Sequence, residues 1–280
     1  MGTVAIPAAP QRVAALDESY VDAAIALDTN VVAYTDYRGV HGGLPAYLGP
    51  DARRYAASAV DLGPLTSPDL EKLVASRPDL IVSAKVRHAQ IYGQLTRIAP
   101  TVFSVTTGPT WQANIRLLAT ALGKTTLAER KLADYHARAR RIGDEIRAKL
   151  GHNPTVSTVR FAGEQTVRLY SQNSFSGSVI TDTGLALSAA SRTSDPTSID
   201  NDISAERILD LDADHIFVSV YDDPQGTARR VQQQFAANPL WDRLSGARTT
   251  VDDLTWMTAV GLQGANRILD DLARTFGVTP

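Results

Sequence analysis

Short apolar runs alternate along the chain with segments whose apolar residues recur at helical spacing. The runs at 80–82 (Leu-Ile-Val) and 216–218 (Ile-Phe-Val) have the composition of parallel strands that are covered on both faces. Each run follows a segment with apolar residues at helical spacing, at 70–74 and at 208–211. This alternation predicts an α/β fold with parallel strands.

The two helix–strand segments are copies of one pattern. Glu71 and Glu206 open the copies, and Asp79 and Asp214 follow eight positions later, so both pairs are offset by 135 residues. We therefore predict two similar α/β lobes. Each lobe would carry one acidic side chain in the first turn of a helix, where the helix dipole favours a carboxylate.

The remaining elements are marked by capping residues, glycine and proline. Strands are expected at 12–17, 31–34, 101–103, 155–161, 166–169 and 248–251, and helices at 20–27, 91–98, 111–122, 175–183 and 262–276. Ser67-Pro68 has the composition of a helix start. Segment 37–54 is rich in Gly, Pro and Tyr and is expected to be a loop.

One predicted helix is much longer than the others. Thr126 and Glu129 have capping-box spacing, and Gly151 suits a C-terminal cap. At ~1.5 Å per residue, segment 126–150 would be roughly 37 Å long. Because it lies between the two copies, we predict a rigid connection rather than a helix on one lobe's surface. The predicted divisions are an N-terminal lobe at 1–122, an interlobe helix at 123–151 and a C-terminal lobe at 152–280.

Composition excludes several protein classes. The 280 residues carry a net charge of −2, so no basic surface for nucleic acid is expected. No apolar run approaches the ~20 residues of a membrane span. The absence of cysteine excludes a disulfide scaffold, a thiol nucleophile and a thiolate metal site. The start, Met1-Gly2-Thr3, has no export-signal pattern, which fits a cytosolic protein or an exported one whose signal lies outside this chain.

Motifs typical of enzymes are missing from the sequence. It contains no nucleophile elbow, phosphate loop or dinucleotide fingerprint. The acidic pairs at 222–223, 252–253 and 270–271 resemble turns or solvated faces, and no feature selects one pair for catalysis. We therefore expect neither an enzyme nor a resident metal. The histidines are scattered and without metal-ligand spacing: His41, His88, His136, His152 and His215.

Aromatic and basic side chains at predicted strand ends indicate a binding site instead. Ligands of open α/β sheets bind beyond the carboxyl ends of the strands, and Arg168 and Tyr170 share one strand face by alternation. Ordinary packing explains any one such residue, whereas the whole set favours a ligand cleft. The candidates are Arg87, His88, Tyr92, Trp111, Arg160, Arg168, Tyr170, Phe175 and Trp256.

Blocks along nearly the whole chain resemble the iron-siderophore substrate-binding proteins of ABC importers. They lie at 6–14, 69–82, 95–102, 203–206, 211–214 and 238–241, followed by Trp256. The resemblance implies a class III periplasmic binding protein, with two Rossmann-like lobes joined by one long helix. It implies that Glu71 and Glu206 dock to arginines of the membrane permease, and that the ligand lies in a shallow interlobe cleft. Arg87, Tyr92, Arg168, Tyr170 and Trp256 match the arginines and aromatics that hold it, and Trp111 and Phe175 join them as candidates.

The resemblance implies an extracytoplasmic receptor that binds a ferric siderophore and delivers it to the permease. Among siderophores a hydroxamate is favoured, because its ferric core is neutral whereas a tris-catecholate core is trianionic and needs a denser basic cluster. Lys85 and His88 would add charge for a catecholate. A haem or cobalamin receptor of the same fold is the alternative, and the scattered histidines disfavour a bare metal. We expect a monomer that is periplasmic or lipid-anchored, with no cofactor and with Fe³⁺ held by the siderophore.

Overall fold

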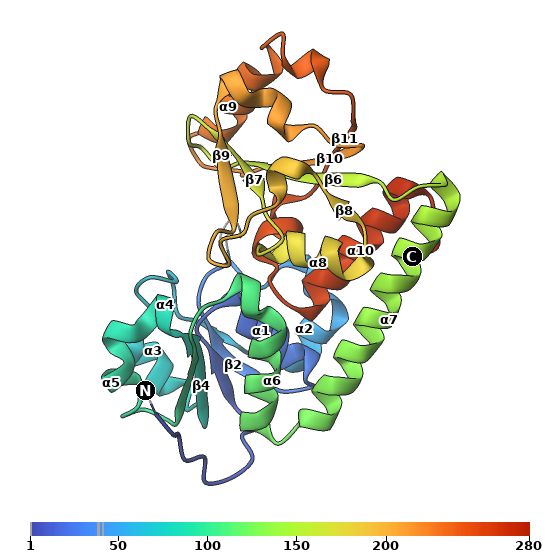
Figure 1. The fold of residues 1–280 in the computed structure, drawn as a ribbon. Coiled ribbons are helices and arrows are strands. Elements are labelled where there is room, and N and C mark those ends of the chain that lie inside the picture. Colours follow the sequence, from blue (N-terminus) through green and yellow to red (C-terminus); the bar gives the residue numbers. More distant parts are fainter. Residues whose placement is uncertain (1, 38–39, 41) are drawn as a thin grey trace. The chain divides into compact units, whose positions relative to one another are not determined.

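The computed structural model describes residues 2–37, 40 and 42–280, and Figure 1 shows its helices and strands. The structure does not describe Met1, Arg38, Gly39 and His41. The expectation that His41 is not a metal ligand therefore falls outside the described residues. The chain forms two compact units. Unit 1 comprises Met1–Asp134 and Thr258–Gly264, and unit 2 comprises Tyr135–Met257 and Ala265–Pro280. The long helix α7 (Thr125–Leu150) therefore contributes residues to both units.

Unit 1 contains a five-stranded sheet in the order β3-β2-β1-β4-β5, which is parallel as the sequence predicted. Strand β3 was not among the expected strands. Helices α1 and α6 lie on one side of this sheet, and α3 and α5 contribute Leu73 and Leu95 to the core on the other (Figure 1). The strands are β1 (Val13–Ala15), β2 (Val31–Tyr34), β3 (Val60–Asp61), β4 (Leu80–Ala84) and β5 (Thr101–Ser104). The helices are α1 (Glu18–Ala26), α2 (Gly49–Tyr55), α3 (Leu70–Ala75), α4 (Lys85–His88), α5 (Tyr92–Leu95) and α6 (Trp111–Leu122).

Unit 2 contains a mixed sheet in the order β11-β10-β6-β7-β9, with β8 also paired to β6. Strand β7 is antiparallel to β6 and β9, unlike the parallel arrangement of unit 1. The short connection at 162–166 permits only a hairpin, because parallel neighbours need a crossover of a dozen or more residues. The strands are β6 (Thr155–Phe161), β7 (Val167–Tyr170), β8 (Ala186–Leu187), β9 (Asp200–Ile203), β10 (His215–Val220) and β11 (Ala247–Thr250). The helices are α8 (Phe175–Thr183), α9 (Thr227–Ala236) and α10 (Leu262–Phe276).

Short 3₁₀ segments and one π-helical turn complete the fold. They are η1 (Ala46–Leu48), η2 (Ala89–Ile91), η3 (Gly108–Thr110), η4 (Ala189–Ser191), η5 (Ala205–Leu211), η6 (Trp241–Arg243) and the π-helical η7 (Leu254–Thr258). The predicted loop at 37–54 contains η1 and α2, and the predicted helix at 91–98 is reduced to η2 and α5. The second copy of the repeat forms η5, which is kinked at Arg207, rather than an α-helix.

Helix α7 has the predicted length but a different start. Gly151, at φ 76°, ends the helix as expected, since glycine adopts the left-handed conformation most readily. Glu129 does not act in a capping box, because its carboxylate accepts hydrogen bonds from Arg116 (Nε–Oε1 2.8 Å). Residues buried at intervals of three and four keep one side of the helix packed along its length: Ala128, Leu132, Tyr135, Ala139, Ile142 and Ile146.

The first copy of the repeat begins at a different cap from the one predicted. Asp69, not Ser67, caps α3, and its Oδ1 accepts the backbone N–H groups of Glu71 and Lys72 at 2.9 and 3.0 Å. The helix therefore begins at Leu70, and Glu71 lies in its first turn as expected. A carboxylate satisfies two N–H groups of this turn, which explains why Asp69 takes the cap position.

The repeated aspartates join the starts of paired central strands. Asp79 precedes β4, and its carboxylate accepts the N–H groups of Gln11 and Arg12, both at 2.8 Å, just before β1. Asp214 precedes β10, and it accepts the N–H and the hydroxyl of Thr155, at 2.7 and 2.9 Å, where β6 begins. Since β1 pairs with β4 and β6 pairs with β10, both copies use the same device to set strand register.

A buried carboxylate holds the start of α10 within unit 1. Asp22 on α1 is 0% exposed and accepts the backbone N–H groups of Gln263 and Gly264, both at 3.1 Å. A Cβ at Gly261 would lie 2.3 Å from Asp22 Cγ, so glycine is required there. Burial outweighs the hydrogen bonds and raises the pKa of Asp22 to about 7.

We expect Asp214→Ala to lower the free energy of unfolding by about 1.5–3 kcal/mol, because it removes a charged acceptor from two donors of Thr155. Urea denaturation measures the change. Asp210→Ala is the matched control, because it removes only the i,i+3 ion pair with Arg207 (2.6 Å), whose expected contribution is about 0–1 kcal/mol. Equal losses in the two variants would contradict the role assigned to Asp214.

The raised pKa of Asp22 predicts a pH-dependent stability. Between the ordinary pKa of 3.8 and about 7, folded Asp22 keeps a proton that the unfolded chain has released. Its contribution to stability therefore falls as pH rises through this window, by roughly 1 kcal/mol per pH unit. Asp22→Asn does not titrate, so the unfolding free energy of the parent minus that of the variant should decline from pH 4 to pH 7 and then level off. A pH-independent difference in urea denaturation would refute this.

Candidate functional site

Two arginines lie opposite each other on one side of the sheet in unit 2. Arg160 on β6 and Arg168 on β7 are directly opposite, a placement that is destabilising for like charges unless something compensates. Asp253 compensates Arg160 through a bidentate contact, accepting from Nε at 2.8 Å and from Nη2 at 2.7 Å. Glu164 accepts a hydrogen bond from Nη2 of Arg168. Each guanidinium is thus paired with its own carboxylate, and the two acids come from different segments of the chain.

Aromatic rings and further acids flank the two arginines. Tyr170 lies two residues beyond Arg168 on the same strand face, as predicted, and is opposite Asp200 on β9. The Arg160 guanidinium lies over the Tyr221 ring, 5.4 Å from its centre. Burial raises the pKa of Asp200, although Arg168 opposes this effect. Hydrogen-bond donors, hydrogen-bond acceptors and aromatic rings therefore lie on one face of the sheet. This combination can bind a ligand that carries polar groups on an apolar framework.

Arg168 is more accessible than Arg160 and Tyr170. Its side chain is 32% exposed, whereas that of Arg160 is 13% exposed and Tyr170 is 8% exposed. The alternate residues Val167 and Leu169 point into the core of unit 2. Alternation along β7 therefore separates a packing face from a face on which Arg168 remains open to a ligand.

In unit 1, Arg87 lies at the carboxyl ends of the central strands, as predicted. Its Nε donates to Asp17 Oδ2 at 2.9 Å and its Nη2 donates to Thr107 Oγ1 at 3.3 Å. Asp17 follows β1 and Thr107 follows β5, and β4 lies between these two strands. The Arg87 side chain is 26% exposed. Its position fits the rule that ligands of α/β sheets lie beyond the strand ends.

His88 has a structural role. It is buried, with Nε2 2.7 Å from the carbonyl oxygen of Leu65 and Nδ1 2.7 Å from Ser83 Oγ. Donation from Nε2 to the carbonyl makes Nδ1 the acceptor from the hydroxyl. Burial lowers the pKa of His88, so the neutral ring fits both contacts. His88 therefore adds no positive charge for a catecholate.

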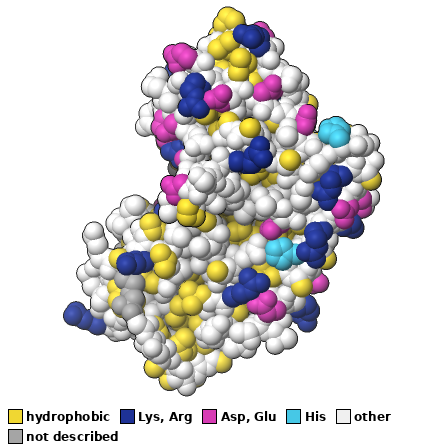
Figure 2. All heavy atoms as spheres, viewed as in Figure 1, with side chains coloured by type: hydrophobic (Ala, Val, Ile, Leu, Met, Phe, Trp, Pro, Cys, Tyr) yellow, Lys and Arg dark blue, Asp and Glu magenta, His cyan; other side chains and the backbone are white. Residues whose placement is uncertain are grey.

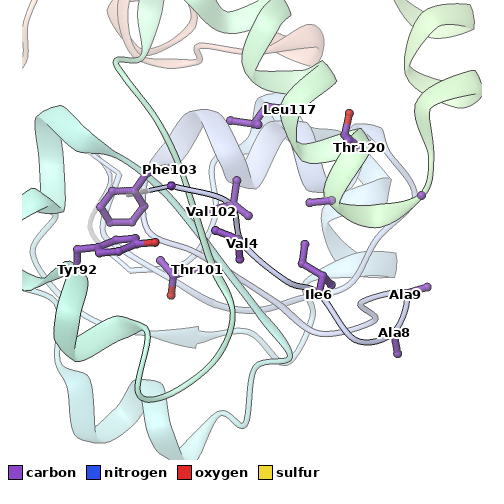
Figure 3. Close-up of a pocket in the computed structure, with 13 residues that line it drawn as sticks. Val4, Ile6, Ala8, Ala9, Tyr92, Thr101, Val102, Phe103, Leu117 and Thr120 are labelled. Carbon is purple, nitrogen blue, oxygen red and sulfur yellow. The ribbon is translucent and has the colours of Figure 1, made fainter.

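Tyr92 lies in a different environment from Arg87. Its ring packs edge-to-face on Phe103 at 5.0 Å and lines a hollow of about 630 Å³ together with Val4 and Ile6 of the N-terminal segment (Figure 3). The hollow borders Thr101 at the start of β5, whereas Arg87 contacts Thr107 beyond the end of that strand. Tyr92 thus lies near the start of β5 and Arg87 beyond its end, and a ligand contact of Tyr92 stays a prediction.

Three candidate aromatics are enclosed rather than open to a ligand. Trp111 is 2% exposed, Phe175 is 4% exposed and Trp256 is 0% exposed. The Trp256 ring stacks on Phe217 at 4.6 Å, and its Nε1 donates to Asp271 at 2.8 Å. Side chains packed in this way contribute to the core of their unit, and the ligand contacts expected of them stay a prediction.

Sequence reasoning missed the acids that position the arginines. The sequence places Asp253 in a turn or on a solvated face, but its side chain is only 11% exposed: it pairs with Arg160 and also accepts from Ser219 Oγ at 3.1 Å. Asp17 was not singled out, although its carboxylate is 1% exposed beside Arg87. Both acids are distant in sequence from their arginines, so no local spacing signals the pairs.

The two acids that open the repeat are on the surface. Glu71 lies in the first turn of α3 and Glu206 in the first turn of η5, and both are exposed. A hydrogen bond from the Ser204 side chain lowers the pKa of Glu206. Exposure of both acids is what a docking role requires.

The described part of the chain shows no cluster of three or more His, Cys, Asp or Glu side chains that could hold a metal ion. Within the same residues, no helix is long and apolar enough to span a membrane. Figure 2 shows lysine and arginine side chains interspersed with acids on the face in view, in keeping with the small net charge.

Comparisons with known proteins agree on one family. A family model described as "Periplasmic binding protein" matches residues 13–250. The probable siderophore-binding lipoprotein YfiY of Bacillus subtilis is 32% identical over 284 residues, covering 97% of this chain and 84% of that protein. The Fe(3+) dicitrate-binding periplasmic protein FecB of Escherichia coli is 27% identical over 288 residues, covering 100% of this chain and 89% of that protein.

A solved structure matches the architecture of the whole chain. Staphylococcus aureus SirA complexed with staphyloferrin B gives a TM-score of 0.85 at 25% sequence identity, covering 100% of this chain and 97% of that chain. The predicted fold, two α/β lobes with one long bridging helix, is confirmed.

Proposed function

Because the chain belongs to the periplasmic binding protein family, we propose that it is the extracytoplasmic component of an ABC importer that captures a ferric siderophore. It is a substrate-binding protein and not an enzyme. Relatives named as a siderophore-binding lipoprotein and as a periplasmic ferric-dicitrate-binding protein support the cargo and the compartment. Iron would remain held by the siderophore, in keeping with the absence of a metal cluster among the described residues.

The observation that carries this proposal is the pair of opposed arginines beside Tyr170. A guanidinium has five N–H donors, and Asp253 engages only Nε and Nη2 of Arg160. Arg168 is partly exposed and bonded through Nη2 to Glu164. Donors therefore remain for the oxygens that surround a chelated ferric ion. A repulsive placement that has no use in packing is typical of a functional site.

Charge balance favours a cargo of low net charge. Each arginine of this face already has a carboxylate partner, and Asp200 lies nearby, so the face carries no excess of positive charge. A trianionic tris-catecholate complex would need such an excess, whereas a neutral tris-hydroxamate complex needs only hydrogen-bond donors. This reasoning supports the hydroxamate class that the sequence favours.

A ferric hydroxycarboxylate complex is the second candidate. Both arginines bind carboxylates within the chain, so a carboxylate of the ligand would replace Glu164 at Arg168 without new geometry. The relative named for Fe(3+) dicitrate supports this class. Haem and cobalamin remain alternatives to be tested in the same titration.

We expect Arg168→Ala to weaken ferric-siderophore binding about ten- to a hundredfold. A charge-assisted hydrogen bond contributes roughly 1.5–3 kcal/mol, and ~1.4 kcal/mol corresponds to a factor of ten. Quenching of tryptophan fluorescence measures affinity for ferrioxamine, ferric citrate, a ferric tris-catecholate, haem and cobalamin. Arg230→Ala, on the exposed side of α9, is the control and should bind like the parent.

The order of affinities decides between the cargo classes. Tightest binding of ferrioxamine supports the hydroxamate proposal, and tightest binding of ferric citrate supports the second candidate. Unchanged affinity of Arg168→Ala for every ferric complex would show that the binding site does not include β7. Binding of haem or cobalamin alone would overturn the siderophore proposal.

We further propose that Glu71 and Glu206 dock to basic residues of the membrane permease. Because both acids are exposed, replacing them with alanine should leave siderophore affinity within about twofold and abolish iron uptake in cells. Asp144→Ala on α7, where the acid is 74% exposed, is the control and should retain uptake. A large loss of affinity in the purified double variant would contradict the docking assignment.

A further inference from the structure

Each copy of the repeat exposes an apolar side chain three residues after its acid. Val74 is 55% exposed and Leu209 is 39% exposed, and they show the same 135-residue offset as Glu71 and Glu206. Single exposed apolar residues are ordinary on a protein surface. The described residues include six large apolar side chains with such exposure. Two of them, Val74 and Leu209, occupy equivalent positions in the two copies of the repeat. The others are Val86, Val105, Leu150 and Ile199.

The equivalence persists although the local backbones differ. Val74 lies on an α-helix and Leu209 on a 3₁₀ segment that is kinked at Arg207. Residues three apart are neighbours on an α-helix and are aligned on a 3₁₀-helix, so in both copies the apolar side chain lies beside the acid. The preceding residues, Leu73 and Ile208, are 0% exposed and belong to the cores of their units.

Glu71 with Val74 and Glu206 with Leu209 mark two surface patches. The basic side chain next to the acid in each patch makes a contact within the chain. Lys72 Nζ donates to the Asp61 carbonyl at 3.4 Å, and Arg207 Nη2 contacts Asp210 Oδ2 at 2.6 Å. Each base therefore has a partner within the chain, although the Arg207 side chain is 59% exposed, and each patch presents an acid and an apolar side chain to a partner. The complementary partner surface has a basic side chain beside an apolar recess, and it occurs twice.

We infer that Val74 and Leu209 are interface residues which, with Glu71 and Glu206, form two equivalent acid-plus-apolar contacts for the permease. This inference rests on the importer role proposed above. An exposed ion pair alone contributes little to affinity, because water and salt screen it. Apolar contact around the pair excludes water and makes the charged contact stronger, as in the centres of protein interfaces.

The test uses Val74→Ser/Leu209→Ser in the full chain. We expect siderophore affinity, measured by fluorescence quenching, to stay within about twofold of the parent. Association with the importer permease in lipid nanodiscs and uptake of radiolabelled siderophore should both fall roughly tenfold or more. Val74→Ile/Leu209→Ile should restore both, and Leu150→Ser, at a side chain 40% exposed outside the repeat, should change neither.

The readouts separate this inference from the proposed function. If the parent binds the permease but no ferric siderophore, the proposed cargo is wrong. The effect of the serine variant on permease binding can still be measured in that case. If the serine variant associates with the permease and supports uptake like the parent, the inference is overturned. It is also overturned if the parent does not bind the permease, or if light scattering shows that the variant disrupts self-association instead.

Discussion

Two aspartates, Asp79 and Asp214, determine how the central strands of each sheet begin. Hydrogen bonds from Thr155 lower the pKa of Asp214, so its carboxylate stays charged at neutral pH. Charged acceptors of this kind form stronger hydrogen bonds than neutral ones. Once the first residues of β1 and β6 are fixed, pairing with β4 and β10 follows, and with it the positions where those strands end. Each aspartate lies between the helical segment that carries Glu71 or Glu206 and the central strand that follows, so the repeat places both acids relative to the sheets in the same way.

Local patterns predicted those elements whose boundaries are set locally. The apolar periodicity and end glycines of α6 and α8, the pattern of α10, and the runs of β2 and β6 gave boundaries that agree with the structure. Three features were missed: Glu129 binds Arg116 instead of completing a cap, β7 runs antiparallel within a hairpin, and the second copy of the repeat winds as a 3₁₀-helix. The short connection between the strands expected at 155–161 and 166–169 does indicate the hairpin. Arg116 lies 13 residues from Glu129, and no spacing within a short window signals that pair or the 3₁₀ winding.

The candidate site was predictable to the level of strand ends and strand faces. The rule about carboxyl ends located Arg87, and alternation located Arg168 and Tyr170 on one face. The acids that hold the arginines were not predictable, because 93 residues separate Asp253 from Arg160. The burial of Trp256 was equally unpredictable from the sequence. Its size and amphipathic character suit both a ligand contact and a core residue. Only its contacts with Phe217 and Asp271 assign it to the core.

The partners of the arginines give the two units different capacities to respond to a ligand. Asp17 is 1% exposed and also accepts hydrogen bonds from the N–H and hydroxyl of Ser19, at 3.0 and 2.5 Å, so its hold on Arg87 is fixed by the cap of α1. Glu164 is 42% exposed and only four residues from Arg168, so a ligand oxygen can displace it at small cost. Exposed ion pairs exchange partners readily, whereas breaking a buried pair leaves an uncompensated charge. Under the function proposed above, Arg168 would adapt to the cargo by exchanging Glu164 for a ligand oxygen, whereas Arg87 would keep the donor geometry that Asp17 fixes.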